Sequence, residues 1–217
     1  ISYRAGRYGL GPATKSLLQD MGIKVDTSVR AYFDYSHQDG PNYEDFPNHP
    51  YWVAGDTPLL ELPVTSVYRG LLASAGPQLS PKLARIPRAP GLASRTGLLE
   101  RVRLTPEGTP LSDAIKGIDA ALAAKLPVIV LSFHSPSLAP GNTPYTDTEE
   151  EVERLYAWLD GVYAHMASRG VAPTMARDRG FSILCMDANW ASDQRVIDIP
   201  RLAVWRTASE ATRCVFS

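Results

Sequence analysis

The run from Val128 to Phe133 is the stretch that most constrains the fold of this chain. It reads Val-Ile-Val-Leu-Ser-Phe, and Pro127 and Pro136 bound it. An apolar run of this length, rich in β-branched residues, predicts a strand that is buried on both faces, as in a parallel sheet covered by helices. We therefore expect an α/β fold with this strand inside it.

A histidine, His134, stands at the C-terminal edge of this predicted strand. In α/β folds this edge is where ligands bind, because the loops that leave the strands converge there. The following loop, residues 135–144, contains three prolines and one glycine, so its backbone is restricted at several positions. His134 is thus the leading candidate for a functional residue, although a histidine at this place can also simply hydrogen-bond a loop carbonyl.

The composition is that of an ordinary globular protein. The chain has 217 residues, of which 44% are hydrophobic and 21% charged, with a net charge of -1. This length suits one large domain or two small ones, and the near-neutral net charge indicates neither a nucleic acid nor an anionic membrane as a partner. No apolar run approaches the roughly 20 residues of a membrane span. Cys185 and Cys214 lack a metal-type spacing and leave the cellular compartment open.

Strands and helices are expected to alternate along most of the chain. The patterns predict strands within residues 1–8, 23–29, 59–67 and 98–104, and helices within residues 12–22, 109–122 and 146–170. Residues 30–56 are expected to be irregular, residues 68–96 to be a connection, and residues after 174 have no assigned role.

Two of these segments carry unusual side chains. Glu61 is a carboxylate in an otherwise apolar strand, so it either faces solvent or is functional. Residues 30–56 mix aromatic rings with acids and two histidines. The rings could pin the segment to the core, line a groove for a sugar polymer, or lie beside a metal site, and we rank these three readings in that order because the histidine and acid spacing fits no known metal pattern.

The helix predicted within residues 146–170 has the strongest pattern. Thr146 and Glu149 have the spacing of a capping box, and Gly170 would end the helix. Trp158 and His165 flank the apolar stripe and are interpreted as packing residues. The stripe itself is expected to consist of Val152, Leu155, Tyr156, Leu159, Val162, Tyr163 and Met166.

Four segments, taken in order, carry a family resemblance. They are residues 3–12, 25–29, 60–64 and 130–135, which read Tyr-Arg-Ala-Gly-Arg-Tyr-Gly-Leu-Gly-Pro, Val-Asp-Thr-Ser-Val, Leu-Glu-Leu-Pro-Val and Val-Leu-Ser-Phe-His-Ser. They resemble successive blocks of the polysaccharide deacetylase family, the NodB homology group or carbohydrate esterase family four. The resemblance implies that residues 1–173 are the C-terminal part of a partial distorted (β/α) barrel of this type, with residues 174–217 as an unassigned tail.

The resemblance also implies an activity, the hydrolytic deacetylation of an N-acetylated or O-acetylated polysaccharide or glycan. In this reading His134 protonates the leaving amine and Leu131 forms a wall of the acetate pocket. Arg4 orients the catalytic carboxylate, and Tyr8 holds the oxyanion through its backbone N–H. Because this block lacks the usual Arg-x-Pro-Tyr pattern, Arg7 could take the place of Arg4.

The family's metal-binding blocks come before its arginine block, and this chain begins at the arginine block. The resemblance implies a divalent metal, zinc, in the complete family protein. We expect residues 1–217 alone to hold no such metal and to turn over no substrate. The expected partner is an acetylated glycan, with no nucleic acid and no membrane span. A catalytically inactive carbohydrate-binding module is the alternative, and a serine hydrolase is disfavoured because no G-x-S-x-G motif is present.

Overall fold

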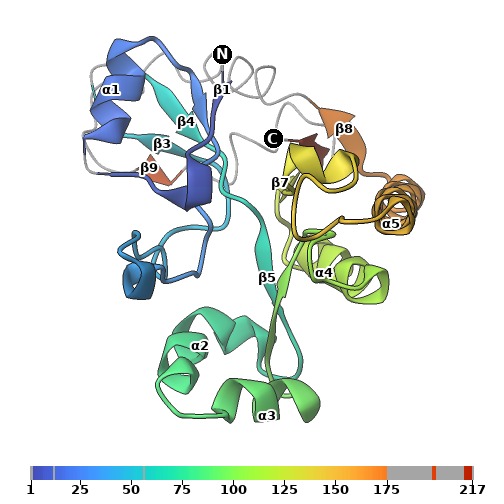
Figure 1. Cartoon of the computed structure of the whole chain (residues 1–217). Helices are drawn as coiled ribbons and strands as arrows, with labels where there is room; N and C mark the ends of the chain where they lie inside the picture. The colour runs from blue at the N-terminus through green and yellow to red at the C-terminus, as the bar shows by residue number, and fades with distance from the viewer. Residues whose placement is uncertain (1, 12, 56, 175–196, 199–212, 217) are drawn as a thin grey trace. The chain divides into compact units, whose positions relative to one another are not determined.

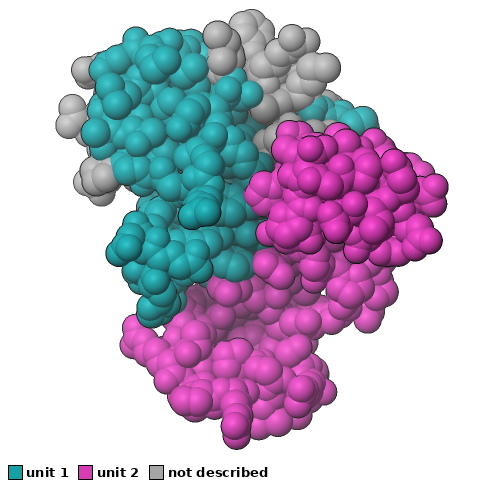
Figure 2. Space-filling view, viewed as in Figure 1, with its two compact units in different colours: residues 1–65, 126–130, 173–217 teal, residues 66–125, 131–172 magenta. Residues whose placement is uncertain are grey.

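The computed structural model describes residues 2–11, 13–55, 57–174, 197–198 and 213–216, and they form a mixed α/β structure (Figure 1). The chain divides into unit 1, residues 1–65, 126–130 and 173–217, and unit 2, residues 66–125 and 131–172 (Figure 2). The predicted α/β class is confirmed. In the part of the chain that the structure describes, the strands form three separate sheets that do not close into a barrel. No described helix is long and apolar enough to cross a membrane.

Unit 1 is built on a five-stranded sheet in the order β1-β2-β4-β3-β9. Strands β1, β2 and β4 are parallel, whereas β3 is antiparallel to both β4 and β9. The predicted strands near the N-terminus, at residues 23–29 and at the start of 59–67, are confirmed. The elements of this unit are β1 (Ser2–Tyr3), η1 (Gly6–Tyr8), α1 (Thr14–Asp20), β2 (Val25–Asp26), η2 (Ser36–Gln38), β3 (Tyr51–Val53), β4 (Leu59–Glu61) and β9 (Ile197–Asp198).

The core of unit 1 explains two differences from the sequence-based expectation. Strand β3 lies within the segment expected to be irregular, and its residues are all buried, so they show no alternation of apolar and polar side chains. Burial of Tyr43, Tyr51 and Trp52 confirms that these aromatic rings pin the segment to the core. The sequence of residues 12–22 predicts a helix with an apolar face of Leu17, Leu18 and Met21. Helix α1 buries Leu18 but leaves Leu17 and Met21 56% and 74% exposed, so this prediction is wrong at two positions.

Unit 2 contains a two-stranded antiparallel sheet of β5 and β6, which register Ser66 with Arg103. The residues between these strands were expected to be a connection, but they form helices α2 and α3, each with a proline at its start, where a missing N–H costs nothing. The elements are β5 (Ser66–Arg69), η3 (Ala73–Ala75), α2 (Gly76–Ala84), α3 (Ala89–Arg95), β6 (Glu100–Arg103), α4 (Leu111–Ala123), η4 (Ser135–Leu138) and α5 (Glu149–Ser168).

The predicted central strand is confirmed as β7 (Val128–Leu131), and its four residues are all buried. It belongs to a three-stranded sheet in the order β7-β10-β8, with β8 at Ala172–Thr174 and β10 at Arg213–Phe216. The apolar run at residues 181–186 and most of the run at 197–205 lie outside the described residues, as does Cys185.

Helix α4 packs on the β5–β6 sheet through a glycine. A Cβ atom at Gly117 would lie 2.8 Å from a methyl carbon of Val102, so a larger side chain at this position would push the helix away from the sheet. The sequence predicts Leu111, Ile115, Ile118 and Leu122 on one face of this helix. Of these, Ile118 is fully buried, and Ala114 and Ala121 are buried as well.

Helix α5 begins two residues later than predicted. The capping box is formed by Thr148 and Glu151: the threonine hydroxyl accepts from the N–H of Glu151, and the Glu151 carboxylate accepts from the N–H of Thr148. The buried stripe contains Trp158, whereas Tyr156 and Tyr163 are 48% and 37% exposed. The expectation for these two tyrosines is therefore wrong, because the buried face is centred on Leu155 and Val162 and both tyrosines stand at its edge.

Replacing Thr148 with alanine is expected to lower the free energy of unfolding by about 1 kcal/mol, because it removes the N-cap oxygen of a helix that carries several pocket residues. Thr148→Ser keeps this oxygen and should keep most of the stability. Urea unfolding followed by far-UV circular dichroism compares the two variants. Equal midpoints for alanine and serine would contradict the assignment of Thr148 as the cap.

Candidate functional site

His134 lies at the C-terminal end of β7, where the sequence placed it, and it starts the turn into η4. Its side chain is 63% exposed, whereas the residues of β7 are buried. A rigid strand therefore positions an imidazole that solvent and ligands can reach. This combination suits a group that exchanges protons.

A buried carboxylate, Glu107, holds this histidine at two points. Oε2 of Glu107 lies 2.7 Å from Nδ1 of His134, and Oε1 accepts the backbone N–H of His134 at 2.7 Å. The Glu107 side chain is only 8% exposed. Because an ionised carboxylate can only accept hydrogen bonds, Nδ1 of the histidine carries a proton, and Nε2 is the nitrogen available for chemistry.

Hydroxyl groups fix the position of Glu107 in turn. Ser137 Oγ donates to Glu107 Oε1 at 3.1 Å, and it lies 2.9 Å from the hydroxyl of Thr143. The Thr143 hydroxyl lies 3.2 Å from that of Thr146. The loop after β7 is thus tied to the carboxylate by a chain of hydrogen bonds, as expected for a loop restricted by prolines.

The ring of Tyr145 stacks on the imidazole of His134, with centroids 5.5 Å apart and planes 15° from parallel. Tyr145 is 50% exposed. The histidine is therefore held from its edge by Glu107 and on one face by an aromatic ring, and both contacts restrict its rotation.

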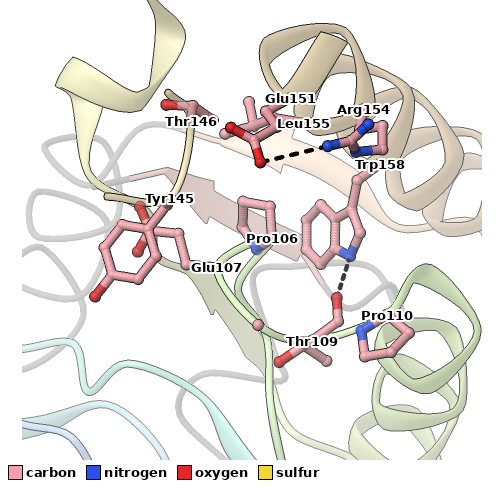
Figure 3. A pocket seen from close by; sticks show the side chains of 11 residues that line it. Pro106, Glu107, Thr109, Pro110, Tyr145, Thr146, Glu151, Arg154, Leu155 and Trp158 are labelled. Carbon is pink, nitrogen blue, oxygen red and sulfur yellow. Dashed lines mark hydrogen bonds and ion pairs between the residues drawn. The ribbon is translucent and has the colours of Figure 1, made fainter. Parts of the chain in front are cut away.

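A pocket of about 430 Å³ adjoins the histidine, since Glu107 and Tyr145 both line it (Figure 3). Trp158 forms part of its wall and donates from Nε1 to the backbone oxygen of Thr109 at 2.8 Å. Arg154 contributes a guanidinium that is 66% exposed and lies 3.5 Å from Glu151. The remaining lining residues are Pro106, Gly108, Pro110, Thr146 and Leu155. Aromatic faces beside a cation and carboxylates suit a polar ring-shaped ligand such as a sugar.

Helix α5 supplies the two large side chains of this pocket because Arg154 and Trp158 stand four residues apart on one face. The sequence interpretation of Trp158 as a packing residue is confirmed by its burial, with 7% exposed. His165, the other flanking residue, lies 3.0 Å from a carboxylate oxygen of Asp119 and does not line the pocket.

Two predicted site residues, Arg4 and Tyr8, lie together in unit 1. Nη2 of Arg4 donates to the Tyr8 hydroxyl at 3.4 Å, and its guanidinium lies 5.3 Å from the ring centroid. Arg7 is exposed and has a positive φ of 52°. The backbone N–H of Tyr8 donates to the oxygen of Ala5 at 3.3 Å, so it must leave this bond to meet an oxyanion.

Another arginine of unit 1, Arg30, was not identified from the sequence. It is 7% exposed, and its guanidinium lies 5.1 Å from the ring centroid of Tyr8 and 4.4 Å from that of Phe33. Nη1 donates to the hydroxyls of Tyr8 and Tyr35, each at 3.4 Å. Aromatic faces and hydroxyls therefore stabilise this buried charge. The only sequence signal was its place just after a predicted strand.

Two carboxylates, Asp26 and Glu61, are fully buried in unit 1 on neighbouring strands and are directly paired in register. Burial raises the pKa of both, and the nearby Asp26 charge raises the pKa of Glu61 further. Glu61 Oε1 accepts the N–H of Val29 at 3.1 Å, and Ser28 donates to Asp26. The possibility that Glu61 faces solvent is therefore excluded.

The structure assigns the predicted residues to different units. His134 and Leu131 belong to unit 2, where Leu131 ends β7 and is 2% exposed, and Arg4, Arg7 and Tyr8 belong to unit 1. Glu107 was missed because it lies 27 residues before His134 in the chain. The available signal was that Glu107, like His134, follows the end of a predicted strand.

The described residues contain no group of three or more histidine, cysteine or acidic side chains that could hold a metal ion. The described residues therefore do not fit the zinc that the family resemblance implies. No family model, curated protein or solved structure matches this chain.

Proposed function

We propose that this protein takes part in the hydrolytic deacetylation of an N-acetylated or O-acetylated glycan, with His134 as the proton donor to the leaving group. The observation that carries this proposal is the pairing of an exposed imidazole with a buried carboxylate, Nδ1 to Oε2 at 2.7 Å, at the end of a buried strand. The order of sequence blocks that resemble the polysaccharide deacetylases supports the same activity.

The roles of the side chains follow from their geometry. Amide hydrolysis needs a proton on the departing nitrogen, because an unprotonated amine anion is a very poor leaving group. As the C–N bond breaks, Nε2 of His134 gives this proton to the departing nitrogen; water adds its oxygen to the carbonyl carbon, and the proton that this water loses returns to Nε2. Glu107 stabilises the ring orientation and the imidazolium form, because a charge-assisted hydrogen bond is stronger than a neutral one.

The pocket beside His134 is proposed to bind a sugar ring of the glycan. The half-exposed ring of Tyr145 provides a flat apolar face, and Glu107, Glu151 and Arg154 provide groups for hydroxyls. The finer fold assignment, a partial NodB-type barrel within residues 1–173, belongs to the same proposal and is supported by the parallel pairing of β1, β2 and β4. A divalent metal is proposed only for the full-length gene product.

A carbohydrate-binding module without catalysis is the second candidate. The exposed ring of Tyr145 beside a polar pocket favours it, because sugars stack on such rings whether or not a reaction follows. Release of acetate separates the two functions. Calorimetric binding of an N-acetylated oligosaccharide without acetate release would support the module and reject the deacetylase.

Replacing Glu107 with glutamine is expected to lower kcat roughly ten- to a hundredfold in the full-length gene product, because the charge-assisted bond to His134 is lost. Asp119→Asn is the matched control, since Asp119 is the carboxylate of another histidine–carboxylate pair of unit 2, with His165 Nε2 at 3.0 Å from its Oδ1. It should leave kcat unchanged. Acetate release by both variants is measured at equal folded concentration, and an equal loss in both would show that Glu107 acts only through stability.

A further inference from the structure

Exposed aliphatic side chains are concentrated in the segment of residues 70–99, which we call the helical extension because it contains α2 and α3 (Figure 1). Five of the ten large hydrophobic residues that are exposed in the described chain lie here, and Leu71 is 83% exposed. The others are Leu72, Ile86, Leu92 and Leu98, which are 40–64% exposed. Single exposed leucines are ordinary, but this concentration marks a surface for an apolar partner.

Backbone hydrogen bonds join the two chain segments that carry three of these residues, Leu71, Leu72 and Leu98. The N–H of Leu72 donates to the oxygen of Leu98 at 2.9 Å, and the N–H of Leu71 donates to the oxygen of Gly97 at 3.1 Å. Leu98 in turn donates to Ala93 of α3 at 2.9 Å. The exposed leucines therefore belong to one ordered part of unit 2.

The helical extension is also strongly basic. Residues 70–99 contain Lys82, Arg85, Arg88 and Arg95 and no acidic residue, although the whole chain has a net charge of -1. These four side chains are exposed, and none forms an ion pair with another described residue. The positive charge is thus available to an external anion.

The two chain segments that join the helical extension to β5 and β6 are closely packed at Gly70. Gly70 has a φ of +107°, and a Cβ atom there would lie 2.6 Å from the oxygens of Gly97 and Leu98, so only glycine lets the two chain segments approach this closely. Arg69, next to it, pairs with Glu100 and with Asp113 of α4. The basic and apolar side chains are therefore presented by an anchored element.

We propose that the helical extension binds the surface of a bilayer that contains anionic phospholipids, with Leu71 and Leu92 entering the interface and the basic side chains on the headgroups. A nucleic acid or an acidic glycan would explain the charge but not the leucines. A second copy of the chain would explain the leucines, but a two-fold contact would bring the two basic segments together. Anionic lipid satisfies both properties.

The proposal is tested by sedimentation of the chain with vesicles of phosphatidylcholine alone and with vesicles that also contain an equal part of phosphatidylglycerol. We expect binding to the second kind, weakened by salt. The double change Arg85→Glu/Arg88→Glu should weaken binding at least roughly 25-fold, at about fivefold for each basic residue lost. Leu71→Ser/Leu92→Ser should weaken it about as much.

The matched control is Leu17→Ser/Met21→Ser on α1, which removes two aliphatic side chains of similar exposure from unit 1. It should bind vesicles like the wild type, and circular dichroism should show all variants folded. Equal binding to both vesicle kinds, equal loss in the control, or no binding above background would overturn the proposal. Concentration-dependent dimers that the Leu71→Ser/Leu92→Ser change abolishes, without vesicle binding, would show that a second copy is the partner.

Discussion

Replacing His134 with glutamine is expected to lower the turnover of an acetylated glycan by roughly 10²–10⁴-fold in the full-length gene product, which is the usual contribution of a general acid. Glutamine keeps a hydrogen-bonding group near Glu107 but cannot deliver a proton to the leaving amine. The metal content and the melting temperature should not change, because His134 is assigned as an acid and its side chain is 63% exposed.

His165→Gln is the control for this experiment. His165 also pairs with a carboxylate, Asp119 at 3.0 Å, and it lies on α5, the helix that carries Arg154 and Trp158 of the pocket. Its replacement should leave turnover within about twofold of the wild type, since no chemistry is assigned to it. Loss of metal together with activity in His134→Gln would contradict the role of His134 as an acid.

Replacing Glu61 with glutamine is expected to stabilise unit 1 by about 1–3 kcal/mol at pH 8, because an ionised carboxylate in a fully buried position lacks the solvation of water. Oε1 of glutamine can still accept the N–H of Val29. Its amide nitrogen can donate to the Asp26 carboxylate, as the protonated Glu61 does. The neutral side chain therefore fits the same site.

The pH dependence follows from the raised pKa of Glu61, which burial and the Asp26 charge cause. Between its ordinary pKa and its raised pKa in the folded chain, the folded state binds more protons than the unfolded state. The stabilising contribution of the protonated Glu61 is complete below the ordinary range, near pH 4, and it is lost as the pH rises through the folded pKa. The pKa of Asp26 is also raised, so its effect on the pH dependence of stability has the same direction.

Urea unfolding at pH 5 and at pH 8 measures this effect. The wild type should lose stability between the two values, and Glu61→Gln should lose less. Glu153→Gln on the exposed side of α5 is the control and should follow the wild type. A wild type that gains stability from pH 5 to pH 8, with no difference in Glu61→Gln, would contradict the burial of this carboxylate.

The fold could be predicted where a single periodic pattern determined the element. Val128 to Leu131 are all buried, as the apolar run indicated, and Leu155 and Val162 of α5 lie on the expected face. The helices α2 and α3 could not be predicted, because prolines and glycines within residues 68–96 also indicate loops. The buried residues of these two helices are small, such as Ala93, so their sequences show no stripe of large apolar residues that would predict a helix.

The candidate site was predicted only in part, for a comparable reason. His134 follows a strong strand pattern, so its place at a strand end could be read locally. Its partner Glu107 is distant in the chain, and only the fold brings the two side chains within 2.7 Å. Tyr145 and Arg154 lie on a loop and a helix whose approach to each other depends on tertiary packing, which no local pattern encodes.

The most direct test is the release of acetate from an N-acetylated oligosaccharide by the full-length gene product, measured beside its His134→Gln variant. The account predicts release by the wild type and at least a roughly hundredfold lower rate in the variant, with binding of the oligosaccharide retained in both. Equal rates in the two proteins, or binding without any release by the wild type, would contradict the assignment of His134 as the proton donor of a deacetylase.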